Sequence, residues 1–543
     1  MTKRATVVGS GASGVHFART LLDRGWEVEM FDVGRDGPAP PNPDDTFPAL
    51  KRNLTDPVRH LLGEHFEGLT LPGGEKEYYG FPPGKEYVFE REESFEFRAA
   101  GFEPLISFAR GGLAQAWTAG AFPFGAADLE EFPLSSDDLL SRYGEIAARI
   151  GVTGVEDDLA PWMPVHANLG TPGDLDEHSR VLLDRARDRR EPLRSKHRCR
   201  VGRSRVAVLL EDRDGRGACG YLGRCLPGCP VGALYTPGHT LEECLRHPGF
   251  RYRSGRYVSR FRTDGGRRVL GVVSRPAGGG AEEETPVEVL VLAAGTLSTG
   301  RIVMESIRRD TGRSVRLPGL MDNRQILVPF VNPAMAGRPV DPATYQYHQV
   351  LLGIDGDSAA DSIHGIVTTL KATMIHPIVQ NLPLDMASAL RVFGNLHAAL
   401  GLVNVNLSDH RRDDCHLSLE DGAPGEDARL VIRYEPPRGE RGRIRRAVRR
   451  VRGALRELGC FAVPGMAHTR PMGASVHYAG TLPMSLSPAP LTTSPEGRSH
   501  DWENLYAVDG SVFPFLPSKN LTFTLMANAT RVADRMADAR SEA

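Results

Sequence analysis

The first 32 residues alternate between apolar and glycine-rich stretches in a regular order. Residues 5–8 form a short apolar run, residues 15–24 carry apolar side chains at helical spacing, and residues 27–31 form a second strand-like run. Gly25 and Trp26 separate the helical stretch from the second run. This order predicts a strand, a helix and a second strand, which together form a β-α-β unit at the N-terminus.

Apolar runs of the same kind recur far along the chain. Residues 287–292 form one that ends in Ala293-Ala294-Gly295, and a helical stretch follows over 298–308. Residues 505–508 form another, followed by a turn and a long apolar helix that reaches residue 536. Such runs are typical of strands buried on both faces of a parallel sheet. They are expected to join the N-terminal unit in one α/β domain.

The pattern changes between residues 317 and 481. Alternating stretches at 325–331, 365–371 and 428–434 predict an antiparallel sheet, which we assign to a substrate domain. Residues 438–458 are strongly basic and helical in spacing. A basic helix could bind nucleic acid, but the periodic apolar positions favour a helix packed on the body with a solvated basic face.

Composition limits the classes of function. The chain has 543 residues, enough for two or more domains, and its 66 basic and 68 acidic residues give a net charge of −2. This balance leaves no bulk field to attract nucleic acid or an anionic membrane. No apolar run is long enough to span a bilayer, and the first strand begins where a signal peptide would stand. We therefore expect a cytoplasmic protein with neither a nucleic-acid partner nor a membrane span.

The glycine-rich turn after the first strand has G-x-G-x-x-G spacing. The first glycine permits the tight turn, the second lets backbone approach a pyrophosphate, and the third lets the helix pack on the strand. The helix start offers free N–H groups to phosphate, and an acid after the second strand can bind a ribose hydroxyl. A plain βα turn is the alternative, and the motif does not decide between dinucleotides. The positions are Gly9, Gly11, Ala12, Ser13, Gly14 and Asp32.

Two C-terminal segments complete the pattern. One runs from Val476 through His477 to Met484 and contains H-x-x-G-T; the other contains Val508-Asp509-Gly510-Ser511 and, further on, Asn520 before the last helix. With the N-terminal motif and the Ala293-Ala294-Gly295 strand end, these segments resemble the glucose–methanol–choline (GMC) family of FAD-dependent oxidoreductases. The resemblance covers both ends of the chain and disfavours a simple NAD-dependent dehydrogenase.

The resemblance implies a His–Asn pair over the flavin, as in sterol oxidases and sugar-oxidising members such as pyranose oxidase. His477 would be the general base and Asn520 would orient the alcohol or product oxygen. Leu521 stands where the family commonly has proline, so the helix start is expected to differ slightly. Further flavin contacts implied by the resemblance are Val258, Ala294, Gly295, Asp509, Gly510, Asn520, Leu521 and Thr522.

A dense run of small residues lies at 108–120 and includes Gly111, Gly112, Ala116 and Trp117. It suits backbone packed closely against a large flat group, although a tight glycine loop under a domain is an equal alternative. The loop resembles the segment of pyranose oxidases that carries a flavin-linking histidine before a tryptophan. Ala116 occupies that place, so we expect non-covalent FAD.

Cys219, Cys225 and Cys229 form a C-x5-C-x3-C segment. Three thiolates at this spacing could hold an iron–sulfur cluster, and the spacing is similar to that of bacterial FAD glucose dehydrogenases. Many family members instead have a cysteine-rich segment here without metal. No fourth cysteine for a cubane cluster is adjacent, so buried free thiols are the favoured interpretation.

The resemblance implies a fold and an activity. The fold is an α/β Rossmann-like FAD-binding domain, discontinuous over 1–40, 205–316 and 485–543, with an α+β substrate domain of mainly antiparallel sheet over 41–204 and 317–484. The activity is oxidation of a CH–OH group, on a sugar, glycoside or aminocyclitol-type substrate, with O2 or a quinone or protein as acceptor. A sterol or other apolar alcohol oxidase, a non-redox lyase and a flavin-binding protein without catalysis remain alternatives.

Overall fold

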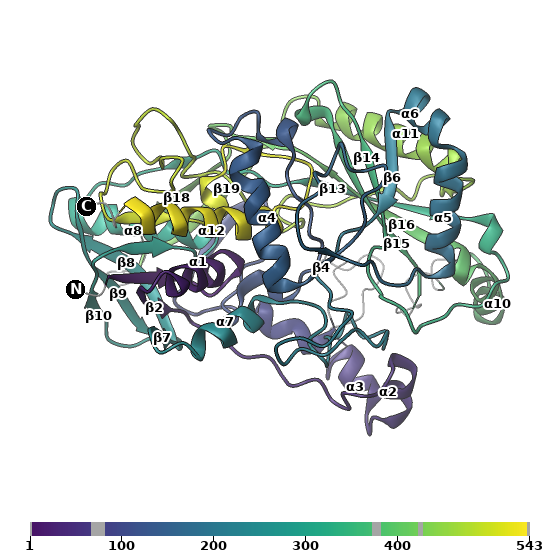
Figure 1. Cartoon of the computed structure of the whole chain (residues 1–543), viewed down its shortest axis with the longest axis horizontal. Coiled ribbons are helices and arrows are strands. Elements are labelled where there is room, and N and C mark those ends of the chain that lie inside the picture. The colour runs from purple at the N-terminus through teal and green to yellow at the C-terminus, as the bar shows by residue number, and fades with distance from the viewer. Residues whose placement is uncertain (1–2, 67–81, 372–378, 380–381, 422–426, 540–543) are drawn as a thin grey trace.

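The helices and strands are arranged around two large β-sheets (Figure 1). The structure is a computed structural model and describes residues 3–66, 82–371, 379, 382–421 and 427–539. A parallel sheet with its helices occupies one end of the molecule, together with the first and last described residues. An antiparallel sheet with its own helices occupies the other end.

The parallel sheet joins strands from both ends of the chain in the order β22-β11-β1-β2-β7. The strands are β1 Arg4–Val8, β2 Glu27–Phe31, β7 Phe250–Arg253, β11 Leu290–Leu292 and β22 Leu505–Ala507. In the register, Val8 lies opposite both Phe31 and Leu292, and Leu292 lies opposite Ala507. The segments that follow these strands therefore meet at one edge of the sheet, where α/β proteins bind their ligands.

The first and last helices pack side by side on this sheet (Figure 1). They share a core with the strands in which Val7, Leu21, Val291 and Val532 are fully buried. The long apolar helix expected at the C-terminus is therefore part of the N-terminal domain's core. The helices around this sheet are α1 Ala12–Asp23, α4 Ser136–Ile150, α7 Pro237–Leu245, α8 Thr296–Thr311 and α12 Thr522–Ala539.

Two smaller sheets lie beside the parallel sheet. One has the order β10-β9-β8 and the other β12-β18-β19-β3. Their strands are β8 Arg256–Thr263, β9 Val269–Pro276, β10 Glu283–Pro286, β3 Phe97–Ala100, β12 Leu317–Pro318, β18 His416–Glu420 and β19 Arg429–Arg433. Short pairs are formed by β4 Val152–Thr153 with β5 Leu169–Gly170, and by β17 Asp409–His410 with β23 Phe515–Leu516.

The antiparallel sheet has the order β20-β13-β16-β15-β14-β6, and β21 also pairs with β13. Its strands are β6 Cys199–Arg203, β13 Arg324–Val331, β14 Val350–Ile354, β15 Ile363–Thr369, β16 Leu400–Leu407, β20 Phe461–Ala462 and β21 His468–Thr469. One face packs on helices through a core that includes Val328, Val403 and Val451. The remaining helices are α2 Phe47–Asn53, α3 Pro57–Leu62, α5 Glu177–Asp188, α6 Arg190–His197, α10 Met386–Leu396 and α11 Glu440–Glu457.

The architecture confirms an α/β domain beside an α+β domain with a mainly antiparallel sheet. The basic stretch forms α11, which buries Ala447, Val451 and Leu455 against the sheet, as the apolar spacing predicts. One expectation is wrong: residues 428–434 do not join the large sheet, because β19 pairs in parallel with β3 in the four-stranded sheet. Residues 161–215, which show no clear pattern, contain α5, α6 and β6.

The predicted domain ranges can be compared with the sequence positions of the strands in the two large sheets. All strands of the parallel sheet fall within 1–40, 205–316 and 485–543, and all strands of the large antiparallel sheet fall within 41–204 and 317–484. Residues 67–81, 372–378, 380–381 and 422–426 of the second set lie outside the described residues. The boundaries themselves stay a prediction.

Candidate active site

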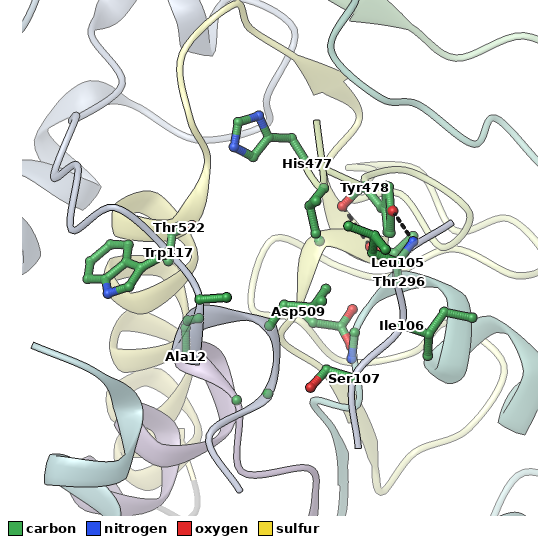
Figure 2. A pocket seen from close by; sticks show the side chains of 18 of the residues that line it. Ala12, Leu105, Ile106, Ser107, Trp117, Thr296, His477, Tyr478, Asp509 and Thr522 are labelled. Carbon is green, nitrogen blue, oxygen red and sulfur yellow. Dashed lines mark hydrogen bonds between the residues drawn. The ribbon is translucent and has the colours of Figure 1, made fainter. Parts of the chain in front are cut away.

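A cavity of about 550 Å³ lies where the two large sheets face each other. Its lining combines residues that follow the parallel strands with residues on β13, β15 and β16. Figure 2 shows side chains from distant segments around it, among them Ala12, Trp117, His477 and Asp509. The structure brings the predicted cofactor and catalytic residues to this lining, with the exception of Gly14 and Gly111.

The glycine turn after β1 has a different steric demand at each glycine. Gly9 has φ +102°, and a Cβ there would lie 2.6 Å from the Ala293 carbonyl oxygen. A Cβ at Gly14 would lie 2.0 Å from the Gly9 carbonyl oxygen, so Gly14 serves helix packing and does not reach the cavity. At Gly11 a Cβ would meet nothing within 4 Å. Only Gly11 therefore leaves open space beside the start of α1.

Asp32 lies at the carboxyl end of β2, as predicted. Its Oδ2 accepts hydrogen bonds from the hydroxyls of Ser10 and, at 3.0 Å, Tyr252. Burial raises its pKa to about 6, although these bonds favour the ionised form. Ser10 also accepts a 2.8 Å hydrogen bond from the Gly111 N–H, which ties the loop to the glycine turn. Gly111 is thus a structural contact behind the cavity wall.

The loop at 111–117 lies directly over the glycine turn. A Cβ at Gly112 would lie 3.2 Å from the Gly11 Cα, so only a small residue fits there. Ala116 and Trp117 follow a 3-10 turn and line the cavity, and the Trp117 indole donates a 2.6 Å hydrogen bond to the Tyr235 carbonyl. Val258 lines the cavity from β8 and is buried.

Asp509 joins the C-terminal segment to the turn between β11 and α8. Its Oδ2 accepts hydrogen bonds from the Gly295 N–H at 2.9 Å and the Thr299 hydroxyl at 2.5 Å. A Cβ at Gly510 would lie 2.3 Å from the Tyr478 carbonyl oxygen, so this segment packs directly on the one that carries His477. The closing segment is held against the strand end by these contacts, with Ala294 and Gly295 beside it on the lining.

His477 is buried, and one of its ring nitrogens is fixed. Its Nδ1 lies 3.0 Å from the Asn323 Oδ1. The Asn323 Nδ2 donates to the carbonyls of Leu407 and Pro517, both at 2.9 Å, and carbonyls can only accept. Asn323 must therefore present its oxygen to the imidazole, which places the proton on Nδ1 and leaves a lone pair on Nε2.

The charge state of His477 follows from its surroundings. Burial, and to a smaller extent the nearby positive charge of Arg470, together lower its pKa to about 4. The imidazole is therefore neutral at neutral pH. Figure 2 shows it projecting toward the side of the cavity where Trp117 and Thr522 lie.

Asn520 lines the same cavity just before α12. Its Oδ1 accepts a 3.0 Å hydrogen bond from the Asn406 Nδ2 on β16. Leu521, in place of the family's proline, is buried in the core next to α4, and α12 begins at Thr522. Both members of the expected His–Asn pair thus line this cavity, and each is held by an asparagine: His477 by Asn323, just before β13, and Asn520 by Asn406 on β16.

Comparisons with known proteins agree with this geometry. The GMC oxidoreductase family model matches residues 411–529, which contain His477 and Asn520. The chain is 25% identical to a 6'''-hydroxyparomomycin C oxidase from Streptomyces lividus, and 25% identical to a paromamine 6'-oxidase from Streptomyces fradiae, in each case over 98% of this chain and 90% of the relative. Together these matches support a GMC family oxidoreductase.

Solved structures share the fold of this GMC oxidoreductase. Pyridoxine 4-oxidase from Mesorbium loti aligns over 98% of this chain and 99% of its own, with a TM-score of 0.59 and 17% identity. A formate oxidase variant from Aspergillus oryzae aligns over 99% of both chains, with a TM-score of 0.63 and 12% identity. The chain is an FAD-dependent oxidoreductase that acts on CH–OH donors, as the sequence predicts.

The residues present fit FAD. The turn at Gly11 and the strand end at Gly295 are both open, since a Cβ at either would meet nothing within 4 Å. The start of α1 offers N–H groups to a pyrophosphate, and the Asp32 carboxyl offers an acceptor to a ribose hydroxyl. No helix in the described part of this GMC oxidoreductase is both long and apolar enough to cross a membrane.

The three cysteines of the C-x5-C-x3-C segment lie among the described residues. In the described ranges, no three side chains of His, Cys, Asp or Glu are arranged to hold a metal ion. Cys219, Cys225 and Cys229 are free thiols, and burial raises the pKa of Cys225 to about 12. The Cys225 Sγ accepts a 3.5 Å hydrogen bond from the Gln346 N–H.

Several site residues were not found from the sequence. They are Ser10, Tyr252, Asn323, Gln325, Asn406 and Arg470. A signal existed for Asn406: the strand at 400–407 is apolar except for Asn404 and Asn406, and buried amides in such a strand need partners. No sequence pattern pointed to Arg470 or Tyr252, because they reach the site through contacts between distant segments.

Proposed function

We propose that this GMC oxidoreductase oxidises a CH–OH group on a sugar ring of an aminoglycoside-type substrate. Both curated relatives carry aminoglycoside names, and each matches over 98% of the chain. Away from the glycine turns, the described lining contains Gln325, Thr368 and Asn404 as well as apolar side chains. Amides and hydroxyls suit a hydroxylated ring better than a sterol, which needs an apolar wall.

The observation that carries the proposal is the fixed tautomer of His477. With Nδ1–H held by Asn323, the Nε2 lone pair is free to take the hydroxyl proton of the alcohol. Bound FAD would supply the acceptor for the hydride of the carbinol carbon; with the hydroxyl proton taken by His477 Nε2, the alcohol would become a C=O group. The Nδ2 of Asn520 donates to the alcohol oxygen and holds it as the proton leaves.

The chain's own residues would hold FAD without a covalent bond. Gly9, Gly11 and Ala12 would surround the pyrophosphate, Asp32 would bind the ribose, and Ala116 has no nucleophile to link the ring. Further contacts would come from Ser13, Gly112, Trp117, Val258, Ala294, Gly295, Asp509, Gly510, Leu521 and Thr522. Because both relatives are named oxidases, O2 is the acceptor that we propose.

The charge of the lining sharpens the proposal. Among the described residues on the cavity wall, the only carboxyls are those of Asp32 and Asp509, both on the flavin side. Arg256, Arg301 and Arg470 contribute positive charges to the lining. The ammonium groups of an aminoglycoside should therefore stay outside the reacting region, and a hydroxyl-bearing end of the substrate should enter.

Anaerobic mixing of the FAD-loaded enzyme with a substrate panel tests the proposal. We expect paromamine-type amino sugars to bleach the flavin absorbance faster than neutral monosaccharides or sterols. Reduction by sterols alone would refute the substrate class. No reduction by any alcohol, with release of aldehyde from a cyanohydrin, would favour the lyase alternative. Peroxide release on admitting air distinguishes O2 from another acceptor.

A further inference from the structure

Four buried or half-buried side chains form a hydrogen-bonded row that ends at Asn520. Arg470 Nη1 donates to Gln325 Oε1. Gln325 Nε2 donates to Asn406 Oδ1 at 3.1 Å, and Asn406 Nδ2 donates to Asn520 Oδ1 at 3.0 Å. Every bond in the row runs in the same direction, from the guanidinium toward Asn520.

The sheet puts these side chains in contact although they are far apart in sequence. In the register of β13 and β16, Gln325 lies directly opposite Asn406. The Arg470 N–H donates a 3.0 Å hydrogen bond to the Gln325 carbonyl, which extends the pairing of β21 with β13. The row therefore crosses three neighbouring strands and reaches the loop before α12.

The direction of the row is set at its first member. A guanidinium has only donors and stays protonated, so Gln325 must turn its oxygen toward Arg470. The Gln325 NH2 then faces Asn406, which must present its own oxygen, and the same condition passes to Asn520. Arg470, Gln325 and Asn406 are 3%, 4% and 0% exposed, so water competes only weakly with these hydrogen bonds.

We propose that Arg470, acting through Gln325 and Asn406, orients the Asn520 amide so that its NH2 group faces the cavity. The inference rests on the proposed function, in which that NH2 donates to the substrate oxygen. The reversed amide would place an acceptor oxygen against the alcohol oxygen and remove the donor that stabilises it as its proton leaves. Arg470, Gln325 and Asn406 are positioning residues for Asn520.

Gln325→Glu and Gln325→Met separate orientation from packing. The glutamate keeps the shape and the acceptor for Arg470, but its carboxylate has no donor for Asn406, so Asn406 and then Asn520 must reverse. Methionine fills the space but has no donor or strong acceptor, so it does not favour either orientation of the Asn406 amide. We expect Gln325→Glu to slow flavin reduction at saturating substrate by about a hundredfold, with a smaller change in KM, and Gln325→Met to slow it less. The opposite ranking would overturn the proposal, because a packing role penalises methionine more.

A matched pair on β16 controls for the added charge. Asn406→Asp reverses the row at its next link, whereas Asn404→Asp adds the same charge two residues away on the cavity wall and outside the row. Asn406→Asp is expected to lose far more of the reduction rate than Asn404→Asp, at equal FAD content and thermal stability. Equal losses would show that charge alone is responsible and would overturn the proposal.

Neutron diffraction from the deuterated, FAD-loaded wild type gives a test that needs no substrate. The ND2 groups of Gln325, Asn406 and Asn520 should point along the row, with that of Asn520 toward the cavity. An oxygen of Asn520 facing the cavity would overturn the inference. If no sugar alcohol reduces the wild-type flavin but the ND2 groups lie as described, the proposed function fails and the orienting row stands.

Discussion

At the scale of single residues, the hydrogen-bond donors and acceptors around His477 and Asn520 determine how these two side chains are oriented. The imidazole of His477 becomes a base because Asn323 has no choice of orientation between two carbonyls and the ring. Arg470 contributes twice, by holding Gln325 and by disfavouring a second positive charge on His477. Both effects are electrostatic, and both act within a buried wall where water competes weakly.

Replacement of Arg470 by methionine should move the acid limb of the pH profile. In the wild type the pKa of His477 is about 4, so the base stays neutral and this group causes no loss of kcat/KM between pH 8 and 5. Removal of the positive charge favours the imidazolium, so the pKa rises and activity falls at a higher pH. The measurement is kcat/KM from pH 4 to 8 for both proteins. A limb at an unchanged position would contradict this.

The sequence motifs predicted His477 and Asn520 but not what holds them. Motifs record residues close in the chain, whereas Asn323, Gln325 and Asn406 act from strands that lie more than 60 residues away from either. The residues that they contact depend on the register of β13 with β16. Alternation of apolar residues indicates on which face of the sheet a side chain lies, but it does not indicate the register.

At the scale of elements, the β1–α1 turn divides its glycines between folding and binding. Gly14 allows α1 to lie on the turn, because a methyl group would collide with the Gly9 carbonyl. A Cβ at Gly11 would meet no protein atom within 4 Å, and the φ of −65° at Gly11 is one that any residue adopts. The motif therefore contains two glycines required by the fold, Gly9 and Gly14, and a third, Gly11, that leaves space for a ligand.

Alanine at these two positions should give different losses. Gly14→Ala should lower the thermal stability of the protein with FAD removed, because backbone must move to relieve a 2.0 Å contact. Gly11→Ala should leave that stability unchanged and weaken FAD binding, since its methyl occupies the space beside the phosphate site. FAD titration and thermal unfolding of the FAD-free proteins test this. Normal FAD affinity in Gly11→Ala would contradict the assignment of the cradle.

Most elements of the parallel part were predictable, because buried strands and capped helices leave strong local patterns. Helix α4 Ser136–Ile150, for example, follows a polar run in which the Ser135 side chain accepts a hydrogen bond from the Asp138 N–H. Strand β19 was predicted as a strand but in the wrong sheet. Its alternation indicates one buried face and does not indicate which neighbour it pairs with.

At the scale of the whole molecule, burial keeps many histidines neutral. Burial lowers the pKa of each of the following: His16, His166, His178, His239, His348, His364 and His477. In the unfolded chain these groups titrate near 6.5. Between about pH 6.5 and 4 the unfolded chain therefore takes up protons that the folded one does not.

Acidification through that window should destabilise the protein. Buried carboxyls oppose the trend, because Asp32 and Asp322 have pKa values raised to about 6 and gain protons in the folded state. The histidines outnumber the carboxyls of raised pKa, so the free energy of unfolding should fall as pH decreases from 6.5 to 5. Thermal unfolding at pH 7 and pH 5 measures this. An equal or higher midpoint at pH 5 would contradict it.

The central claim is that FAD and a neutral His477 meet across one cavity built from both ends of the chain. Single-turnover flavin reduction in FAD-loaded wild type and His477→Ala tests it most directly, with an amino sugar alcohol and its analogue deuterated at the carbinol carbon. Deuterium should slow reduction in the wild type. His477→Ala should bind FAD normally but reduce it at least about a hundredfold more slowly. Reduction of the flavin in His477→Ala at the wild-type rate would contradict the role of His477 as the base.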